Sequence, residues 1–294
     1  MKYKINADRL MRNLFEMAKI GMNENGGIDR EFGSEADAET REWLKEYWNK
    51  NIGLTAATDA IANLRIQRSG TEALLPIVMG SHHDAVPDGG KYDGAMGVLI
   101  ATEIMQTIAE NEIKLRHPFQ VISFTGEEPS PFNLSTLGSK VICGKLKKED
   151  LFDCRHRETG ELLSDAIGKV GGDIAQLEEA RLQKGAVAAF LEAHNELGGY
   201  LEEEGLSIAS VSHITGIYRE EIRIYGEANH AGTTMMQNRK DAMLALSELA
   251  LKIEAAAKEF HDPNVVATVG YVKIIPNEAN IIAGEAKAIV DIRT

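Results

Sequence analysis

The sequence contains little cysteine. Only Cys143 and Cys154 occur in 294 residues, and they form neither a CxxC pair nor a disulfide framework. Cys143 lies in an apolar stretch with helical spacing, and unpaired cysteines are among the residues most often buried in proteins. We therefore expect both cysteines to be reduced and structural.

Positive charge is also scarce. The chain has 32 Lys and Arg residues against 45 Asp and Glu residues, which gives a formal net charge of −13 at pH 7. Nucleic acids and anionic membranes are bound through basic surfaces. The charge balance therefore argues against both classes of partner, and we expect neither nucleic acid nor membrane to be bound.

Long hydrophobic runs are absent as well. No apolar run approaches the roughly 18 residues needed to cross a bilayer. Residues 1–20 mix acidic, basic and apolar side chains at helical spacing, unlike a signal or transit peptide. The sequence has no internal repeat and no long linker. We expect a cytoplasmic protein, long enough for two ordinary domains.

The most informative stretch is a polar, glycine-rich segment over residues 80–97. It follows an apolar run at 74–79, which is typical of a buried strand, and leads into residues 98–108, whose apolar spacing predicts a helix. The polar residues thus lie where a strand ends. In open α/β sheets, ligands bind at the carboxyl ends of the strands, so we expect this segment to contribute to a binding site.

Candidate metal ligands lie in this segment. Alternate residues of an extended backbone share a face, so His82 and Asp84 point to one side and His83 to the other. Asp84 can hold one ring nitrogen of His82 and leave the other free for a metal. Asp93 follows a turn, and the glycines after it, including Gly94, allow the backbone to pack closely against the site. A polar surface loop with one satisfied histidine is the alternative.

Two further polar clusters follow predicted strands. Residues 118–124 predict a strand that ends before Glu127 and Glu128, and residues 186–191 predict one that ends before His194. If these strands neighbour each other, their polar ends converge on one edge of the sheet. Imidazole and carboxylate ligands together suit zinc, manganese, cobalt or nickel better than calcium. The predicted ligands are His82, Asp93, Glu128 and His194.

The adjacent acids Glu127 and Glu128 can take different roles in a hydrolysis. An extended backbone would turn one toward the metals and the other aside, so one can ligate while its neighbour takes the proton of an attacking water. A carboxylate such as Asp93 can bridge two ions, and paired metals activate water for hydrolysis. The alternative for the Glu pair is a solvated acidic turn.

The order of predicted elements divides the chain into two domains. Residues 5–20 and 36–48 predict helices, and up to residue 211 strands and helices alternate, as in a mixed sheet flanked by helices. From residue 212, strand-like runs surround one amphipathic helix at 239–260. We expect an α/β catalytic domain over 1–211 and a smaller α+β domain over 212–294. The expected strands of the smaller domain are 216–225, 265–275 and 285–292.

Three residues of the smaller domain are candidates for substrate contacts. His230 lies between a predicted strand and the long helix and could donate a hydrogen bond to a developing oxyanion, although a capped turn is the alternative. Asn280 and Arg293 supply an amide and a guanidinium, the groups that match a carboxylate. From chemistry alone, a surface position explains them equally well. We expect the remaining histidines to be structural or exposed: His83, His117, His156, His213 and His261.

Taken together, the motifs resemble the amidohydrolase and carbamoylase branch of the M20 metallopeptidase-like family. This branch includes N-carbamoyl-L-amino-acid hydrolases, allantoate amidohydrolases and β-ureidopropionases. The resemblance covers nearly the whole chain. It rests on GSHHDAVPDGGKYDGAMGV, the Glu127–Glu128 pair, LGSKVICG, EAHNELGGYLE, GEANHAGTT with NRKDA, and PNEANIIAGEAKAIVDIR.

The resemblance implies roles in the larger domain by position. His82, Asp93 and His194 would ligate one metal ion. Asp93 and Glu128 would be shared with, or belong to, a second ion, and Glu127 would be the general base. The implied cofactors are therefore two divalent metal ions, zinc or manganese, cobalt or nickel.

The resemblance also implies roles for the smaller domain. His230 would reach into the active site of the other subunit, and Asn280 with Arg293 would clamp a substrate carboxylate. The smaller domain would mediate homodimerisation and act as a lid. By analogy the chain ends inside this domain, before the segment in which relatives supply a last histidine ligand to the second metal.

The implied reaction is hydrolysis of a linear amide or ureido C–N bond in a small ureido or N-acyl carboxylate, such as an N-carbamoyl-L-amino acid or allantoate. The alternatives are an aminoacylase or exopeptidase of the same superfamily, or a catalytically impaired dimeric relative that binds a metal or ligand. Three positions depart from the family pattern. Pro131 and Leu197 stand where Arg and Gln are usual, and Met235 where Pro is usual.

Overall fold

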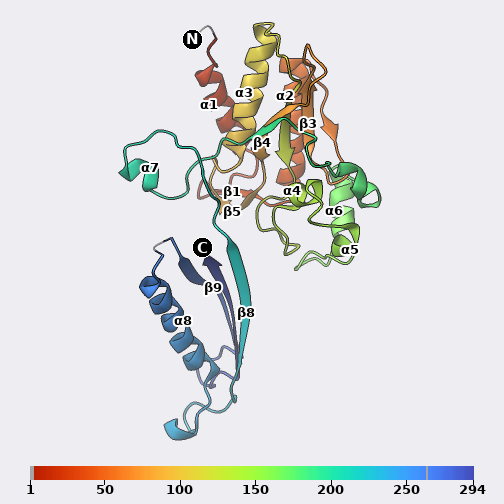
Figure 1. Ribbon diagram of the computed structural model, residues 1–294. Coiled ribbons are helices and arrows are strands. Elements are labelled where there is room, and N and C mark those ends of the chain that lie inside the picture. Colours follow the sequence, from red (N-terminus) through yellow and green to blue (C-terminus); the bar gives the residue numbers. More distant parts are fainter. Residues whose placement is uncertain (1–2, 263) are drawn as a thin grey trace. The chain divides into compact units, whose positions relative to one another are not determined.

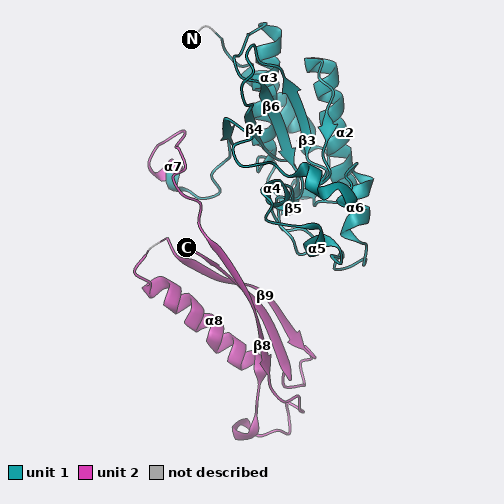
Figure 2. Ribbon diagram, turned by 45° about the vertical axis from the view of Figure 1, so that its right-hand side comes forward, with its two compact units in different colours: residues 1–200 teal, residues 201–294 magenta. Residues whose placement is uncertain are grey.

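The computed structural model describes residues 3–262 and 264–294 (Figure 1). The chain separates into two compact units, unit 1 over residues 1–200 and unit 2 over residues 201–294 (Figure 2). This division falls before the expected boundary at 211. The segment that follows helix α7 (Tyr200–Glu203) forms no helix or strand up to residue 216. The catalytic and dimerisation roles of the two units stay predictions.

Unit 1 is built on a five-stranded mixed sheet with the order β2-β3-β6-β4-β7. Strand β4 runs parallel to both β6 and β7, so the carboxyl ends of these three strands lie at one edge. Strand β3 pairs antiparallel with β2 and β6. The predicted mixed sheet and the predicted convergence of three strand ends are thus confirmed. The strands are β2 (Ala57–Thr58), β3 (Leu64–Arg68), β4 (Ile77–His82), β6 (Phe119–Phe124) and β7 (Ala189–Leu191).

Helices cover both faces of this sheet, as the apolar patterns predicted. Val121 of β6 packs in a core with α1, α2 and α3, whereas the next residue, Ile122, packs against Ile142 of α4. Successive side chains of a strand point to opposite faces, so the two cores lie on opposite sides. Gly53 ends α2 in the left-handed conformation. The helices are α1 (Ala7–Ala18), α2 (Glu35–Ile52), α3 (Ala95–Glu110) and α4 (Leu137–Ile142).

The rest of unit 1 consists of short elements. Strands β1 (Ile28–Arg30) and β5 (Ala85–Gly89) form an antiparallel pair. Another buried apolar cluster joins Phe32 and Phe132 to a group of short helices. These helices are α5 (Lys148–Leu151), α6 (Leu163–Lys169) and the 3₁₀ helix η1 (Ile174–Ala180).

Unit 2 contains a three-stranded antiparallel sheet with β10 in the middle and helix α8 packed against it. Ala286 and Ala288 of β10 are fully buried in a core with Ala242 and Leu246 of α8, because small side chains let the helix approach the central strand. No helix in the described part of the chain is both long enough and apolar enough to cross a membrane. The elements are β8 (Ile217–Tyr225), η2 (Met236–Asn238), α8 (Ala242–Glu259), β9 (Val266–Ile275) and β10 (Glu285–Arg293).

Both cysteines are free, as expected, but Cys143 is exposed. The prediction of a structural, buried cysteine is therefore wrong at this position. Helix α4 ends at Ile142, so Cys143 occupies the C-cap and turns away from the core that Ile142 enters. Cys154 is partly buried and packs against the cluster around Phe132.

Candidate metal centre

Three predicted ligands meet at the carboxyl end of β4. His82 is the last residue of that strand, Asp93 precedes α3, and His194 follows β7. Each offers one ligand atom within 4.8 Å of the other two, and among the described residues this ligand group contains no fourth member. Nε2 of His194 lies 3.1 Å from Oδ1 of Asp93, and Nε2 of His82 lies 4.0 Å from the same oxygen. His82 is buried, whereas His194 is exposed to solvent, so the ligand group opens on the His194 side.

Backbone carbonyls determine which ring nitrogen each histidine presents. Nδ1 of His82 lies 3.0 Å from the carbonyl oxygen of Asp84, and Nδ1 of His194 lies 2.9 Å from that of Asn195. A carbonyl oxygen can only accept, so each Nδ1 carries a proton and the neutral ring has its lone pair on Nε2. Two imidazole nitrogens and one carboxylate oxygen therefore face each other, a donor set that suits zinc and related divalent ions.

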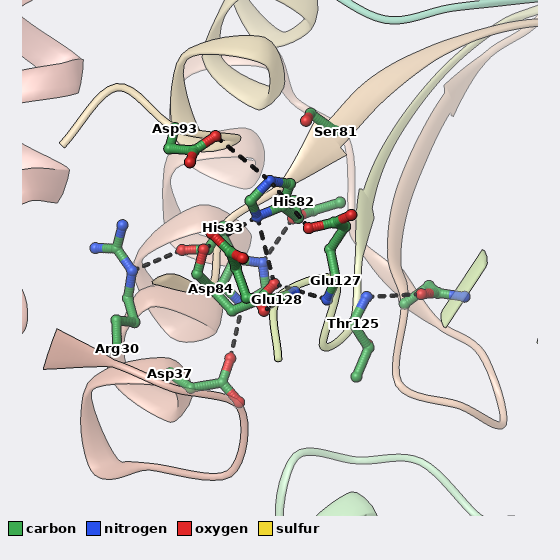
Figure 3. Close-up of polar contacts among 12 residues, drawn as sticks. Arg30, Asp37, Ser81, His82, His83, Asp84, Asp93, Thr125, Glu127 and Glu128 are labelled. Atoms are coloured by element: carbon green, nitrogen blue, oxygen red, sulfur yellow. Dashed lines mark hydrogen bonds and ion pairs between the residues drawn. The ribbon is translucent and has the colours of Figure 1, made fainter. Parts of the chain in front are cut away.

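Asp84 supports the site through its backbone as well as its side chain. Nδ1 of His82 donates to the carbonyl oxygen of Asp84, whereas the expected partner of this nitrogen, the Asp84 carboxylate, lies 3.6 Å away, beyond hydrogen-bond distance. It also accepts hydrogen bonds from the backbone N–H groups of Glu128, at 3.0 Å, and of Glu127, at 3.2 Å (Figure 3). Asp84 thus orients His82 through its carbonyl oxygen and holds the backbone of the acid pair through its carboxylate.

Negative charge is concentrated around His82. Oε2 of Glu127 lies 3.6 Å from Nε2 of His82. Burial alone would lower the pKa of His82, but the hydrogen bond and charge of Asp84, with the charge of Glu127, raise it to about 9. Burial raises the pKa of Glu128, and despite the opposing charge of His82 the neighbouring carboxylates bring it to about 7. A cation placed here would relieve this repulsion, so both donor types and charge fit a divalent metal.

Glu127 and Glu128 differ in their relation to the ligand group. Burial also raises the pKa of Glu127, whose carboxylate lies directly beside His82. The carboxylate of Glu128 stands outside the group formed by His82, Asp93 and His194. The assignment of Glu128 as a ligand and of Glu127 as a base stays a prediction.

Two glycines permit the close packing that the sequence predicted. A Cβ on Gly94 would lie 2.4 Å from ring atoms of His82, and the φ of +60° at Gly94 is itself unfavourable for other residues. A Cβ on Gly97 would lie 2.3 Å from the carbonyl oxygen of Ala193, which precedes His194. Larger residues at either position would displace a ligand.

Behind the site lies a buried polar network that the sequence analysis did not identify. His83 is fully buried, which agrees with its expected structural role. Its ring nitrogens lie 2.8 Å from Asp37 Oδ1 and 2.6 Å from Ser123 Oγ, and Arg41 donates to Asp37 at 2.9 Å. Arg30 donates to the carbonyl oxygen of His83 at 2.6 Å (Figure 3). We call these five residues the His83 network.

His230 and Asn280 lie together in unit 2. His230 forms an antiparallel bridge with Ile281, and the N–H of Ala231 donates to the carbonyl oxygen of Asn280 at 2.9 Å. Nδ1 of His230 accepts a hydrogen bond from the N–H of Gly232 at 3.0 Å. The neutral ring therefore carries its proton on Nε2, where it can be donated to another group.

Arg293 lies at the opposite end of the same sheet. It pairs with Ile217 at the start of β8, whereas the loop of His230 follows the end of that strand. Strand β10 has nine residues, so its ends are roughly 26 Å apart at about 3.3 Å per residue. Asn280 and Arg293 of one subunit therefore cannot clamp the same small carboxylate, and a clamp formed by both residues needs two subunits.

Comparison with known proteins shows which family the chain resembles. The family model for peptidase family M20/M25/M40 matches residues 78–283. The N-carbamoyl-L-amino acid amidohydrolase of Geobacillus stearothermophilus is 34% identical over 290 residues, which cover 98% of this chain and 70% of the relative. The allantoate amidohydrolase of Bacillus subtilis (strain 168) is 30% identical over 299 residues, covering 99% and 70%.

A solved structure agrees with these relatives. The crystal structure of a hydantoinase/carbamoylase family amidase from Burkholderia ambifaria matches with a TM-score of 0.77 and 36% identity, covering 99% of this chain and 70% of that one. The matched range of the family model includes the ligand group, both Glu residues and His230. The chain therefore belongs to peptidase family M20/M25/M40, and its similarity is to the amidohydrolases and carbamoylases of that family.

Proposed function

We propose that this protein is a metal-dependent amidohydrolase that cleaves a linear ureido or amide C–N bond of a small carboxylate-bearing substrate. The observation that carries the proposal is the ligand group of His82, Asp93 and His194 with the Glu127 carboxylate 3.6 Å from His82. The relatives named for N-carbamoyl-L-amino acids and allantoate support the ureido class. The free cysteines are in keeping with a cytoplasmic location.

His82, Asp93 and His194 would hold one divalent ion, and Glu128 would contribute with Asp93 to a second. The chemistry that bound zinc, manganese, cobalt or nickel supplies is activation of water and polarisation of the scissile carbonyl. Asp84 keeps the His82 ring in the tautomer that leaves Nε2 free for coordination. The concentrated negative charge around His82 favours cation binding at this position.

Glu127 is proposed as the general base. It takes a proton from the attacking water and delivers it to the nitrogen that leaves when the C–N bond breaks. Burial raises the pKa of Glu127, which makes its carboxylate a stronger proton acceptor. The hydrogen bond from its backbone N–H to Asp84 holds it next to the ligand group.

His230 is proposed to act in the site of the other subunit of a homodimer formed through unit 2. Its Nε2–H would donate to the carbonyl oxygen of the substrate as that oxygen gains negative charge. The hydrogen bond that Nδ1 accepts from Gly232 supports this tautomer. Asn280 from the same subunit as His230, and Arg293 from the other, would hold the substrate carboxylate, in keeping with their positions at opposite ends of the sheet.

The test combines elemental analysis of the purified chain with ammonia release from N-carbamoyl-L-amino acids and allantoate after addition of Zn²⁺, Mn²⁺, Co²⁺ or Ni²⁺. We expect bound metal and ammonia release that Glu127→Gln abolishes. A metal-loaded chain that cleaves only N-acyl amino acids or peptides would instead be an aminoacylase or exopeptidase. A chain with neither metal nor turnover would contradict the proposal and leave a ligand-binding relative.

A further inference from the structure

The His83 network lies directly behind the metal-ligand end of β4. Nε2 of His83 is 2.8 Å from Asp37, whose carboxylate accepts, so this nitrogen carries a proton. Nδ1 is 2.6 Å from Ser123 Oγ, and in the neutral ring it accepts the hydroxyl proton. Both nitrogens of one imidazole are thus bound by side chains from α2 and β6. These two hydrogen bonds hold the ring in one orientation.

Two arginines complete the network, and burying their charges costs free energy. Arg41 donates to Asp37, and Arg30 donates to the carbonyl oxygens of His83, Met17 and Ile20. Arg30 and Arg41 are each only 1% exposed. Burying such charges costs free energy that apolar residues of similar volume would not, so a contribution to stability alone is a weak reason for them. A role in fixing geometry explains the arrangement better.

The network does not itself react. Its order, Ser123 to His83 to Asp37, repeats the residue types of a serine hydrolase triad, in which the serine attacks a bound substrate. All three side chains are 0% exposed, however, and Ser123 lies in a strand with neighbours on both sides. A substrate cannot reach Ser123.

We propose that Asp37 and His83 are positioning residues for the metal centre. His83 follows the last residue of β4, His82, and its ring bonds Asp37 and Ser123, whereas the side chains of its neighbours His82 and Asp84 lie at the ligand group and the acid pair. Fixing the ring of His83 in the core, and its carbonyl on Arg30, therefore fixes the directions of both neighbours. His82 is a ligand, and the Asp84 carboxylate holds the backbone of the acid pair.

One buried network thus fixes the direction of the ligand His82 and, through Asp84, the backbone position of the acid pair. This inference rests on the proposed metal-dependent function, and it predicts an effect on metal binding itself. A supporting side chain matters because a ligand must be held in its binding geometry before the metal arrives.

The test is a Co²⁺ titration of the purified chain, followed by visible absorption and by competition with a chelator. Asp37→Asn is expected to weaken Co²⁺ binding roughly 10-fold to 100-fold, the effect typical of a lost supporting contact, and to change the absorption band, which reports ligand geometry. The matched control is Glu103→Gln. Glu103 is also a buried carboxylate paired with an arginine, Arg9, but it lies on α3, where it accepts further hydrogen bonds from Asn6 and Thr107. The band and the affinity should therefore stay as in the wild type.

The outcomes separate positioning from stability. A folded Asp37→Asn chain with wild-type affinity and band would overturn the proposal. If that variant does not fold, Ser123→Ala decides, because it removes one bond to His83 and keeps the Asp37–Arg41 pair. Ser123→Ala should weaken Co²⁺ binding severalfold and shift the band, and unchanged values would equally overturn the proposal. A wild-type chain that binds no Co²⁺ would refute the metal-dependent function itself.

Discussion

The metal-ligand end of β4 in unit 1 and the His230 loop of unit 2 carry the same kind of side chain in opposite surroundings. His82 is 2% exposed and lies beside the carboxylate of Asp84, with the His83 network behind it. His230 is exposed, and within the described residues its ring accepts one hydrogen bond, from the backbone N–H of Gly232. The difference matches the two proposed roles, because a proposed metal ligand should be fixed in advance, whereas a group proposed to reach another subunit's substrate should remain accessible.

The largest expected effect comes from removing the proposed base, Glu127, while leaving the ligand group intact. Glu127→Gln keeps the size of the side chain and removes its proton acceptor. We expect kcat for ureido substrates to fall about 100-fold to 10,000-fold, because proton transfer by a positioned side chain is worth that much. Metal content, measured by elemental analysis, should not fall. A variant that retains wild-type kcat would assign the base role elsewhere.

His230→Ala tests the proposed role of the exposed histidine in unit 2. We expect kcat to fall about 100-fold to 1,000-fold, as for loss of one oxyanion donor, with no change in metal affinity. His213→Ala is the matched control, since His213 is another exposed histidine of unit 2 and its ring is hydrogen-bonded to the adjacent Ser212. Equal activity of both variants would remove His230 from the reaction.

A mixing experiment sharpens this prediction into a test of shared sites. Glu127→Gln and His230→Ala chains are each expected to be inactive, but a heterodimer would contain one site with both residues intact. After subunit exchange of an equal mixture, activity should return to about a quarter of the wild type, because half of the dimers are mixed and each has one intact site. Failure to recover activity, with heterodimers present by mass spectrometry, would place both residues in one subunit's site.

The tight packing around His82 is tested by a single methyl group. Gly94→Ala would place a Cβ 2.4 Å from the His82 ring, so we expect metal affinity to fall roughly 10-fold to 100-fold. Gly90→Ala is the control from the same segment, because a Cβ there would meet nothing within 4 Å. Competition titration against a chelator measures the metal affinity of both variants. Identical affinities would mean that the ring moves aside without loss.

Local patterns predicted much of this geometry. Apolar spacing at 36–48 predicted α2, and three apolar runs followed by His, Asp or Glu predicted strands β4, β6 and β7. Their convergence could be anticipated because parallel strands bring their carboxyl ends to one edge. Periodicity and strand polarity are local properties, so they can be read without tertiary contacts.

The remaining features depend on contacts that no local pattern encodes. Asp37 meets His83 across 46 residues, and only the docking of α2 on the sheet brings them together. Asn280 and Arg293 are close in sequence, yet an extended strand separates them by most of the length of the sheet. The exposure of Cys143 depends on where α4 ends, because its last residue is Ile142 and Cys143 occupies the C-cap.

The smallest expected effect concerns the stability that the buried network lends to unit 1 in acid. Burial alone would raise the pKa of Asp37, but the charge of Arg41 and the hydrogen bonds from His83 and the N–H of Gly33 hold it well below its usual range. The unfolded chain takes up this proton below about pH 4 while the native chain does not, so stability is lost as pH falls further.

The free energy of unfolding, measured with urea between about pH 4 and 2.5, should therefore fall less steeply with decreasing pH for Asp37→Asn than for the wild type. The two slopes should differ by at most about 1.4 kcal/mol per pH unit, the effect of one proton. Glu221→Gln, in a solvent-exposed ion pair of unit 2, should leave the slope close to the wild type because water screens that pair. Parallel curves for Asp37→Asn and the wild type would mean that Asp37 does not titrate differently in the folded chain. The contrast between a fixed, buried site and an accessible loop would then rest on geometry without an electrostatic contribution from Asp37.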